Sequence, residues 1–339
     1  MIYWCIELSS NVVVVADWDI DGVVSAAQIV YSQEVVGKYP LDGKRRVFLI
    51  PSTSKTLPFI FNEVSSLNVS HLVLLDIAYS RDVMFFLKKI KSLNIYSIYI
   101  DHHISSFIYS KTIESLVDEF IVGKIPTAYL VYQLMNSLKI SLTSRLKAFI
   151  EAANTIEGGK QKALNRKFIQ LVIAVSKTLA HSRNREQWEK LIRWLSSPLP
   201  QTSMPFNINI DKFIEPQKNS EDLNLFANEL ALRAEKIFNV RFIDARKTRP
   251  RYRPSAIASA LYRIFKNPVI LLLNNKEGKS YIVVKSKDST AYIIALELYR
   301  KGIAIDIMGH QTLSYTLLRD DVDINQVKNF IRNIILKKM

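Results

Sequence analysis

Residues 12–27, VVVVADWDIDGVVSAA, run from four valines into three aspartates and then into glycine and small residues. β-Branched residues favour strands, and a strand that is apolar at every position is typical of a parallel sheet buried on both faces. Asp17, Asp19 and Asp21 follow this strand at once. Carboxylates this close make one another harder to ionise. The stretch therefore predicts a buried parallel strand that ends at a site requiring positive charge.

Strand-length apolar runs alternate with amphipathic segments through the first half of the chain. This alternation predicts an α/β domain with a doubly wound parallel sheet. From about residue 125 the pattern is mostly helical. The expected strands are 11–16, 45–51, 71–76 and 95–101, and the expected helices between them are 25–39, 56–67 and 80–93.

Prolines at positions 198, 200 and 205 interrupt the helical pattern and mark a connection. We expect residues 220–238 to form a helix that joins two domains. The last hundred residues predict a smaller α/β domain, with helices at 254–265, 289–302 and 324–336 and strands at 241–248, 268–275 and 280–286. The predicted boundaries are 1–195 for the first domain, 196–239 for the linker and connecting helix, and 240–339 for the second domain.

The chain of 339 residues carries 46 Lys and Arg against 31 Asp and Glu, a net charge of +15. This balance favours a polyanionic partner such as nucleic acid. The single cysteine, Cys5, excludes an internal disulfide and fits a reducing compartment. The first ten residues lack the pattern of a signal peptide, and no apolar run approaches the ~20 residues of a membrane helix. We therefore expect a cytoplasmic protein with no membrane partner.

Acids and histidines end two more of the predicted strands. Asp76 ends the run 71–76, Asp101 ends the run 95–101, and His102 and His103 follow at once. Ligands of parallel α/β sheets gather at the carboxyl ends of the strands, and carboxylate and imidazole ligands suit divalent metals. A pair of metal ions at this edge would supply the positive charge that the aspartates of the first stretch require.

These residues resemble a known family. In order, DWDIDG, LLDIA and IDHH are similar to the first three motifs of the DHH phosphoesterase superfamily, and the first is most similar to its RecJ-like branch. RPSAIASALYRIFKNPVILLL, VVKS and MGH resemble the DHH-associated C-terminal domain. The resemblance covers nearly the whole chain. It implies a catalytic DHH domain followed by a substrate-binding domain.

Carried over by position, the resemblance implies two divalent metal ions, with manganese favoured and magnesium as the alternative. Asp19 and Asp21 would bind one ion each, Asp76 would bridge both, and His102 would be a further ligand. Asp17 would be a ligand or would support one.

The resemblance also implies roles beside the metal ligands. His103 would contact the scissile phosphate or protonate the leaving oxygen, and Asp101 would orient His102.

Two positions depart from the family pattern. Many relatives carry a histidine four residues before the first metal-binding aspartate, where this chain has Val15. The fourth motif supplies an aspartate in relatives, and ANTIEGG here offers Glu157, one residue early, followed by Gly158 and Gly159. We expect Glu157 to be a metal ligand. If both losses are uncompensated, the protein is an inactive relative that binds single strands in a replication or repair assembly.

In the second domain, Gly309 and His310 match the glycine–histidine turn with which relatives hold a nucleic-acid end. Met308 replaces the first of the usual two glycines. Lys285 and Ser286 stand where relatives place Arg and Ser, and a lysine binds phosphate as a point charge. These residues are the expected phosphate-binding set.

A basic stretch, RKTRPRYRP at 246–254, precedes the first helix of the second domain. Its cations and aromatic ring are suited to the phosphates and bases of a single strand, although a solvated connection rich in arginine fits equally well. The candidates for substrate binding are Arg249, Arg251, Arg253 and Tyr252, with Arg246 and Lys247 beside them.

The expected activity is metal-dependent hydrolysis of single-stranded DNA or RNA from an end. Three alternatives remain: a phosphodiesterase for short oligonucleotides or cyclic dinucleotides, a non-catalytic scaffold, and, least favoured, an inorganic pyrophosphatase. Expected partners are single strands or short oligonucleotides, with a replication or repair protein and a second copy of the chain as further candidates.

Overall fold

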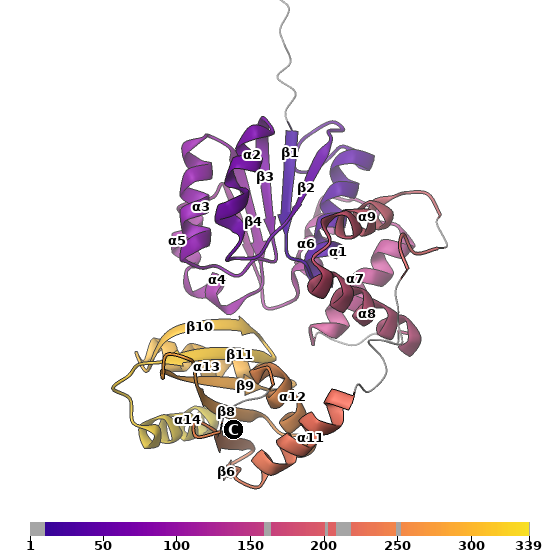
Figure 1. Cartoon of the computed structure of the whole chain (residues 1–339). Helices are drawn as coiled ribbons and strands as arrows, with labels where there is room; N and C mark the ends of the chain where they lie inside the picture. The colour runs from indigo at the N-terminus through magenta and orange to yellow at the C-terminus, as the bar shows by residue number, and fades with distance from the viewer. Residues whose placement is uncertain (1–10, 159–163, 201–202, 208–217, 249–251, 339) are drawn as a thin grey trace, which may run out of the picture. The chain divides into compact units, whose positions relative to one another are not determined.

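The computed structural model describes residues 11–158, 164–200, 203–207, 218–248 and 252–338. The chain divides into two compact units, residues 1–214 and 215–339 (Figure 1). Cys5, Gly159, Arg249 and Arg251 lie outside the described residues.

The first unit contains a five-stranded sheet in the order β2-β1-β3-β4-β5, and every neighbouring pair is parallel. The strands are β1 (Asn11–Ala16), β2 (Val47–Pro51), β3 (Val69–Leu75), β4 (Tyr96–Asp101) and β5 (Glu119–Val122). The doubly wound parallel sheet predicted from the sequence is confirmed. The strand β5 was not predicted, because EFIV is only four residues long and each of its side chains is half-buried.

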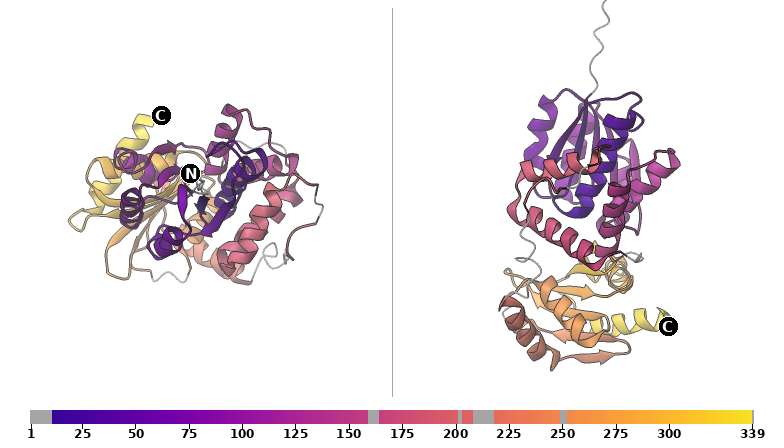
Figure 2. Two further views of the ribbon diagram at one scale, coloured as in Figure 1. Left: turned by 90° about the horizontal axis from the view of Figure 1, so that it is seen from above. Right: turned by 90° about the vertical axis from the view of Figure 1, so that its right-hand side faces the viewer.

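Both faces of this sheet are covered, as the valines of β1 require. Val12 and Val14 pack in one core, and Val13 and Val15 pack in the other. The first core is closed by α1 (Ile20–Val30), α6 (Thr127–Ser137), α7 (Ser144–Ile156), α8 (Arg166–Ser182) and α9 (Arg185–Ser196). The second is closed by η2 (Leu57–Ile60), α2 (Phe61–Ser66), α3 (Arg81–Ser92) and α5 (Ser110–Glu114) (Figures 1 and 2).

Two short helical stretches complete the described part of this unit. The chain after α1 continues as a π-helical stretch, Tyr31–Val36, and α4 (Ile104–Ile108) follows β4. The helix expected at 25–39 therefore begins five residues earlier than predicted, directly after the aspartates. That early start matters for the site, because it puts Asp21 inside the first turn of α1.

The second unit has a six-stranded sheet in the order β10-β11-β9-β8-β7-β6. Its pairs are antiparallel except for β7 and β8, which are parallel. The strands are β6 (Glu235–Ile237), β7 (Val240–Asp244), β8 (Val269–Asn274), β9 (Ser280–Lys285), β10 (Ala304–His310) and β11 (Leu313–Leu318).

Helices also cover this second sheet. One core joins α11 (Lys218–Ala231) and α12 (Pro254–Phe265) to β7, β8 and β9. The helix α13 (Thr290–Arg300) packs on β10 and β11. The last helix is α14 (Ile324–Lys338), and Nζ of its Lys328 lies 5.2 Å from the ring centre of Phe242 in β7. The smaller α/β domain predicted from the sequence is confirmed.

The segment 220–238 differs from the prediction. Instead of one connecting helix, α11 ends at Ala231 and β6 pairs with β7 as a hairpin. Ala227 and Leu230 of α11 are buried in the second unit's core, so this helix is part of that unit. None of the described helices is both long and apolar enough to cross a membrane.

Candidate metal centre

The carboxyl ends of three neighbouring strands bring the predicted acids and histidines to one edge of the first sheet. Ala16 pairs with Leu75, and Leu75 pairs with Ile100. The residues that follow β1, β3 and β4 therefore start side by side, as the sequence predicted.

The turn between β1 and α1 is tight and hydrogen-bonded. Asp19 caps α1, because its Oδ1 accepts hydrogen bonds from the backbone N–H groups of Asp21 at 2.9 Å and Gly22 at 3.1 Å. The carboxylate of Asp17 accepts one from the N–H of Trp18 at 2.7 Å. A Cβ at position 22 would lie 2.6 Å from the carbonyl oxygen of Asp17. Glycine is therefore required for α1 to begin so close to β1.

Asp21 is buried and is held by the start of α6. Its Oδ2 accepts a hydrogen bond from the N–H of Thr127 at 2.8 Å, and its Oδ1 accepts one from the N–H of Ala128 at 2.9 Å. The N-terminus of a helix favours a negative group. Each carboxylate oxygen has a second lone pair, so Asp21 remains able to bind a cation.

Asp76 is buried beside the same helix end. Its φ of 57° lies in the left-handed region, which aspartate adopts more readily than most residues. Its backbone N–H bonds the carbonyl of Ile100 at 3.0 Å, and its Oδ1 accepts a hydrogen bond from the hydroxyl of Thr127 at 3.0 Å. Thr127 thus fixes Asp21 and Asp76 relative to each other.

His102 completes a cluster with these two carboxylates. Its Nε2 lies 3.5 Å from Oδ1 of Asp76 and 3.6 Å from Oδ2 of Asp21. Both distances are long for a hydrogen bond. Two ligands bound to one ion at about 2.1 Å lie about 3.0–3.6 Å apart at bond angles of about 90–120°. The spacing is therefore that of ligands sharing an ion.

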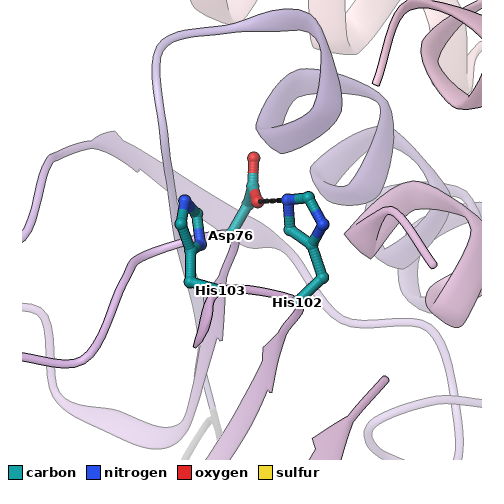
Figure 3. A group of neighbouring side chains, drawn as sticks. All are labelled: Asp76, His102 and His103. Carbon is teal, nitrogen blue, oxygen red and sulfur yellow. Dashed lines mark ion pairs between the residues drawn. The ribbon is translucent and has the colours of Figure 1, made fainter. Parts of the chain in front are cut away.

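His103 lies on the other side of the Asp76 carboxylate from His102 (Figure 3). Ligand atoms of Asp76, His102 and His103 all lie within 4.8 Å of one another. The structure therefore brings together two of the predicted ligands and the histidine expected to act on the phosphate.

The partner of Asp101 differs from the prediction. We expected Asp101 to orient His102, but its Oδ1 lies 2.7 Å from Nδ1 of His103, and its Oδ2 accepts a hydrogen bond from the N–H of His103 at 3.2 Å. The hydroxyl of Ser106 donates to the same Oδ2. Asp101 is fully buried at the end of β4, and α4 follows so closely that the nearest imidazole is that of His103.

The two histidines differ in charge because their surroundings differ. Burial, with the positive charge of His103, lowers the pKa of His102 to about 3, so this imidazole is neutral and can bind a metal. Burial alone would also lower the pKa of His103, but the Asp101 carboxylate raises it to about 9. Burial would raise the pKa of Asp101, yet the charge and hydrogen bond of His103 hold it below its usual value.

The remaining carboxylates are compensated only in part: burial, for example, raises the pKa of Asp17 by more than the charge of His103 or that of Arg183 lowers it. Burial and the charge of Asp19 raise the pKa values of Asp17 and Asp21 to about 7. Burial and the charge of Asp21 raise that of Asp76 well above its usual value. Within the described residues, the ring nitrogen within 4 Å of both the Asp21 and the Asp76 carboxylate is Nε2 of His102, whose imidazole is neutral. The charge of His103 lowers the pKa of Asp21 only in part, so the further positive charge of a divalent cation fits these buried acids.

The other predicted ligands lie outside the group formed by Asp76, His102 and His103. Asp17 and Asp19 are half-buried on the turn before α1. Glu157 is half-buried at the C-terminal end of α7. Val15 is fully buried in the second core of the first unit, so this position supplies no replacement ligand. The roles of Asp17, Asp19 and Glu157 stay predictions.

In the second unit, the residues expected to bind phosphate lie on adjacent strands. Leu313 pairs with both Lys285 and His310, and Nζ of Lys285 lies 3.4 Å from Oγ1 of Thr312. Gly309 has a φ of 111°, and a Cβ there would lie 2.2 Å from the carbonyl oxygen of Leu313. Glycine is therefore required at this position by the hairpin itself.

Ser286 is buried in the second unit. Its hydroxyl donates to the carbonyl of Asp288 at 2.6 Å and accepts a hydrogen bond from the N–H of Ala291 at 3.1 Å. These bonds fix the entry into α13. A role in binding phosphate stays a prediction for Lys285, Ser286, Gly309 and His310.

The structure describes only part of the basic stretch 246–254. Arg246 forms an ion pair with Asp244 at 2.9 Å. Arg253 is exposed just before α12, and the half-buried ring of Tyr252 lies 5.8 Å from that of Phe226. The proposed stacking of Tyr252 on a base stays a prediction, as do the roles of Arg249, Arg251 and Arg253.

Solved structures share the fold that carries this cluster. RecJ from Thermus thermophilus, in complex with Mn²⁺, superposes with a TM-score of 0.54 and 12% identity over 97% of this chain and 52% of RecJ. The DHH domain of a member of a ribosomal protein family gives a TM-score of 0.52 and 14% identity, over 97% and 87% of the two chains. No protein-family model and no curated protein sequence matches the chain.

The chain has the RecJ-like DHH fold. This confirms, for the fold, the resemblance drawn from the motifs DWDIDG, LLDIA and IDHH. The chain spans about half the length of the Thermus RecJ.

Within this DHH fold, two polar residues were missed from the sequence. Thr127 and Ser106 each donate a hydroxyl hydrogen bond to a buried carboxylate of the site. A signal for Thr127 was present in PTAYLVY, because Pro-Thr opens the helix that the sequence predicts there. This signal does not place Thr127 at the site unless the strand β5 that precedes the helix is also predicted.

Proposed function

We propose that the protein is a metal-dependent phosphodiesterase that hydrolyses single-stranded DNA or RNA from an end. The observation that carries this proposal is the buried cluster of Asp21, Asp76 and His102, in which Nε2 of His102 lies 3.5 Å from an oxygen of Asp76 and 3.6 Å from one of Asp21, as two ligands of one ion would. The Asp101–His103 pair stands beside it. A DHH fold with this arrangement offers a cation site next to a proton donor.

We propose that the cofactor is a pair of divalent ions, with manganese favoured. When bound, such ions lower the pKa of a coordinated water and offset charge on the phosphate. The ligand set is Asp17, Asp19, Asp21, Asp76, His102 and Glu157.

The proposed proton donor is His103. Its pKa of about 9 keeps the imidazole protonated at neutral pH, and its Nδ1 is held by Asp101. The proton available for the leaving oxygen is then the one on Nε2. Asp101 stabilises the imidazolium and fixes the ring, while Thr127 keeps Asp21 and Asp76 in place.

The second unit is proposed to hold the nucleic acid. Phosphate would be bound by Gly309, His310, Lys285 and Ser286, and single strands by Arg249, Arg251, Arg253 and Tyr252. We further propose that the protein acts in the cytoplasm in nucleic-acid repair, with residues 1–195 as the catalytic domain and 240–339 as the substrate domain.

One observation favours a second candidate, a non-catalytic subunit that binds single strands. Val15 occupies the position of a ligand histidine in many relatives, and it is fully buried in the core. A protein that has lost one metal site in this way can keep the fold and the strand-binding surface.

The experiment that decides is hydrolysis of end-labelled single strands of graded length with Mn²⁺ and with EDTA. We expect shortening from one end with Mn²⁺, and none with EDTA or in Asp76→Asn. Cleavage confined to the shortest strands supports a phosphodiesterase for oligonucleotides instead. Binding without cleavage at any metal concentration would support the non-catalytic subunit and contradict the proposed activity.

A further inference from the structure

Exposed phenylalanines and cations lie together beside the sheet edge that carries the metal centre. Phe59 is 82% exposed and Phe85 is 45% exposed. The exposed cations on the same two elements and their approach are Lys55, Arg81, Lys88 and Lys89. We call these six residues the aromatic–basic strip.

The strip runs along α3, and η2 packs beside that helix. Arg81, Phe85 and Lys89 are spaced by four residues, so they share one face of α3 over about 12 Å. The guanidinium of Arg81 lies 5.4 Å from the ring centre of Phe85, and Nζ of Lys89 lies 4.9 Å from that of Phe61. Phe85 therefore has a cation close to its ring, and Lys89 reaches the ring of Phe61, which directly follows η2.

The strip begins where the proposed substrate must pass. Arg81 follows Asp76 by five residues, and η2 begins six residues after β2 ends at Pro51. Both segments thus leave the carboxyl edge of the parallel sheet, where the metal centre also lies (Figure 1).

The charges on the strip are selective for an anionic partner. Asp82, the acid on α3, is half-buried in the first turn of that helix, and Glu63 on the neighbouring α2 forms an ion pair with Arg185 at 2.6 Å. Exposed aromatic rings beside cations match the bases and phosphates of a single strand. A duplex hides the faces of its bases, so it cannot use the rings in this way.

We infer that the aromatic–basic strip is a binding path for single-stranded nucleic acid, along which bases stack on Phe59 and Phe85 while the cations contact phosphates. This inference rests on the proposed function, because it assigns the strand whose end reaches the metal centre. It extends the substrate from a few nucleotides to a longer strand.

The test measures binding of a fluorescent strand of about 20 nucleotides by anisotropy, in EDTA, so that hydrolysis plays no part. Stacking on one ring contributes about tenfold or more to affinity. We therefore expect Phe59→Ala with Phe85→Ala to raise the dissociation constant about a hundredfold, and Lys88→Glu to raise it and flatten its salt dependence. Phe59→Trp should keep the affinity, because indole also stacks.

The matched control is Val36→Ala. Val36 is 41% exposed, close to the 45% of Phe85, but it ends the π-helical stretch that follows α1 and is not on η2 or α3. Its replacement should leave strand affinity unchanged. Equal affinity of the double alanine variant and wild type overturns the inference, as does a loss in Phe59→Trp equal to that in Phe59→Ala. Equal affinity of the double alanine variant and wild type would instead indicate that this surface binds an acidic protein partner.

Hydrolysis separates this inference from the proposed function. In Mn²⁺, the ratio of long-strand to dinucleotide cleavage should fall in the double alanine variant. If wild type cleaves a dinucleotide and this ratio is unchanged, the strip is wrong and the proposed activity stands. If wild type binds the strand through the strip but cleaves nothing, the strip stands and the proposed activity is wrong.

Discussion

Thr127 acts on two carboxylates at once. Its N–H bonds Asp21 and its hydroxyl bonds Asp76, and the side chain is fully buried. Polar residues that orient metal ligands change affinity for the metal by about 10–100-fold when they are removed. At the scale of single residues, the distance between the Asp21 and Asp76 carboxylates therefore depends on Thr127, which is not itself one of the proposed metal ligands.

Replacement of Thr127 by valine tests this dependence. Valine keeps the backbone N–H that bonds Asp21 and removes only the hydroxyl that bonds Asp76. We expect the affinity for Mn²⁺, measured by calorimetry, to fall at least about tenfold, while Thr127→Ser stays close to wild type. A Thr127→Val protein that binds Mn²⁺ as tightly as wild type would show that the hydroxyl has no such role.

The Asp101–His103 pair gives a dependence of stability on pH. The pKa of His103 is about 9 in the folded protein, above the value of about 6.5 expected when unfolded. The stabilisation from its proton is therefore fully present below about pH 6.5 and is lost as the pH rises through about 9.

In metal-free protein, His103→Gln should accordingly cost more free energy of unfolding at about pH 6 than at about pH 9.5. Urea unfolding of both proteins in EDTA gives this difference. Equal costs at the two pH values would mean that Asp101 does not hold a charged His103.

At the scale of elements, the early start of α1 organises the site. The turn from β1 reaches α1 through Asp17 and Asp19, and Gly22 lets the helix pass within contact of the Asp17 backbone. Replacing this glycine should move the turn, because backbone atoms cannot give way as a flexible side chain can.

We expect Gly22→Ala to lower the free energy of unfolding by about 1–3 kcal/mol and to weaken Mn²⁺ binding. Gly278→Ala is the control: a Cβ there meets nothing within 4 Å, although its φ of 81° disfavours alanine. That variant should lose some stability and no affinity for the metal. A Gly22→Ala protein with wild-type stability and affinity would contradict the close approach.

The elements that the sequence predicted well are those with one dominant pattern. The valine run of β1 and the apolar runs of β3 and β4 identify buried parallel strands, and the ends of these strands then place Asp76 and His102 at one edge. Short elements lack such a pattern. Glu235–Ile237 was included in a helix, and β5 was missed, because a strand of three or four residues is too short to show a period.

The sequence also could not predict which of two neighbouring histidines bonds Asp101. Asp101, His102 and His103 are consecutive, and the motif assigned Asp101 to the wrong histidine. The choice depends on the turn between β4 and α4 and on Ser106, which holds the other side of the carboxylate. Thr127 lies 51 residues from Asp76 along the chain, so its hydrogen bond follows only from the fold.

At the scale of the whole molecule, a net charge of +15 predicts that strand binding weakens as salt increases. Each phosphate neutralised on a single strand contributes about 0.7 to the slope of log affinity against log salt. Replacing Arg249, Arg251 and Arg253 together by alanine should reduce this slope by up to about 2. Binding isotherms at several salt concentrations measure it, and an unchanged slope would identify these arginines as ordinary surface residues.

The central claim is that the cluster of Asp21, Asp76 and His102 binds a divalent ion. The most direct measurement is Mn²⁺ binding to the purified protein, followed by electron paramagnetic resonance, for wild type and Asp76→Asn. Asparagine keeps the size of the side chain and the hydrogen bond from Thr127 but removes the charge. We predict tight binding to wild type and a loss of at least about a hundredfold in Asp76→Asn. Equal binding of Mn²⁺ by the two proteins, or none by wild type, would contradict the account.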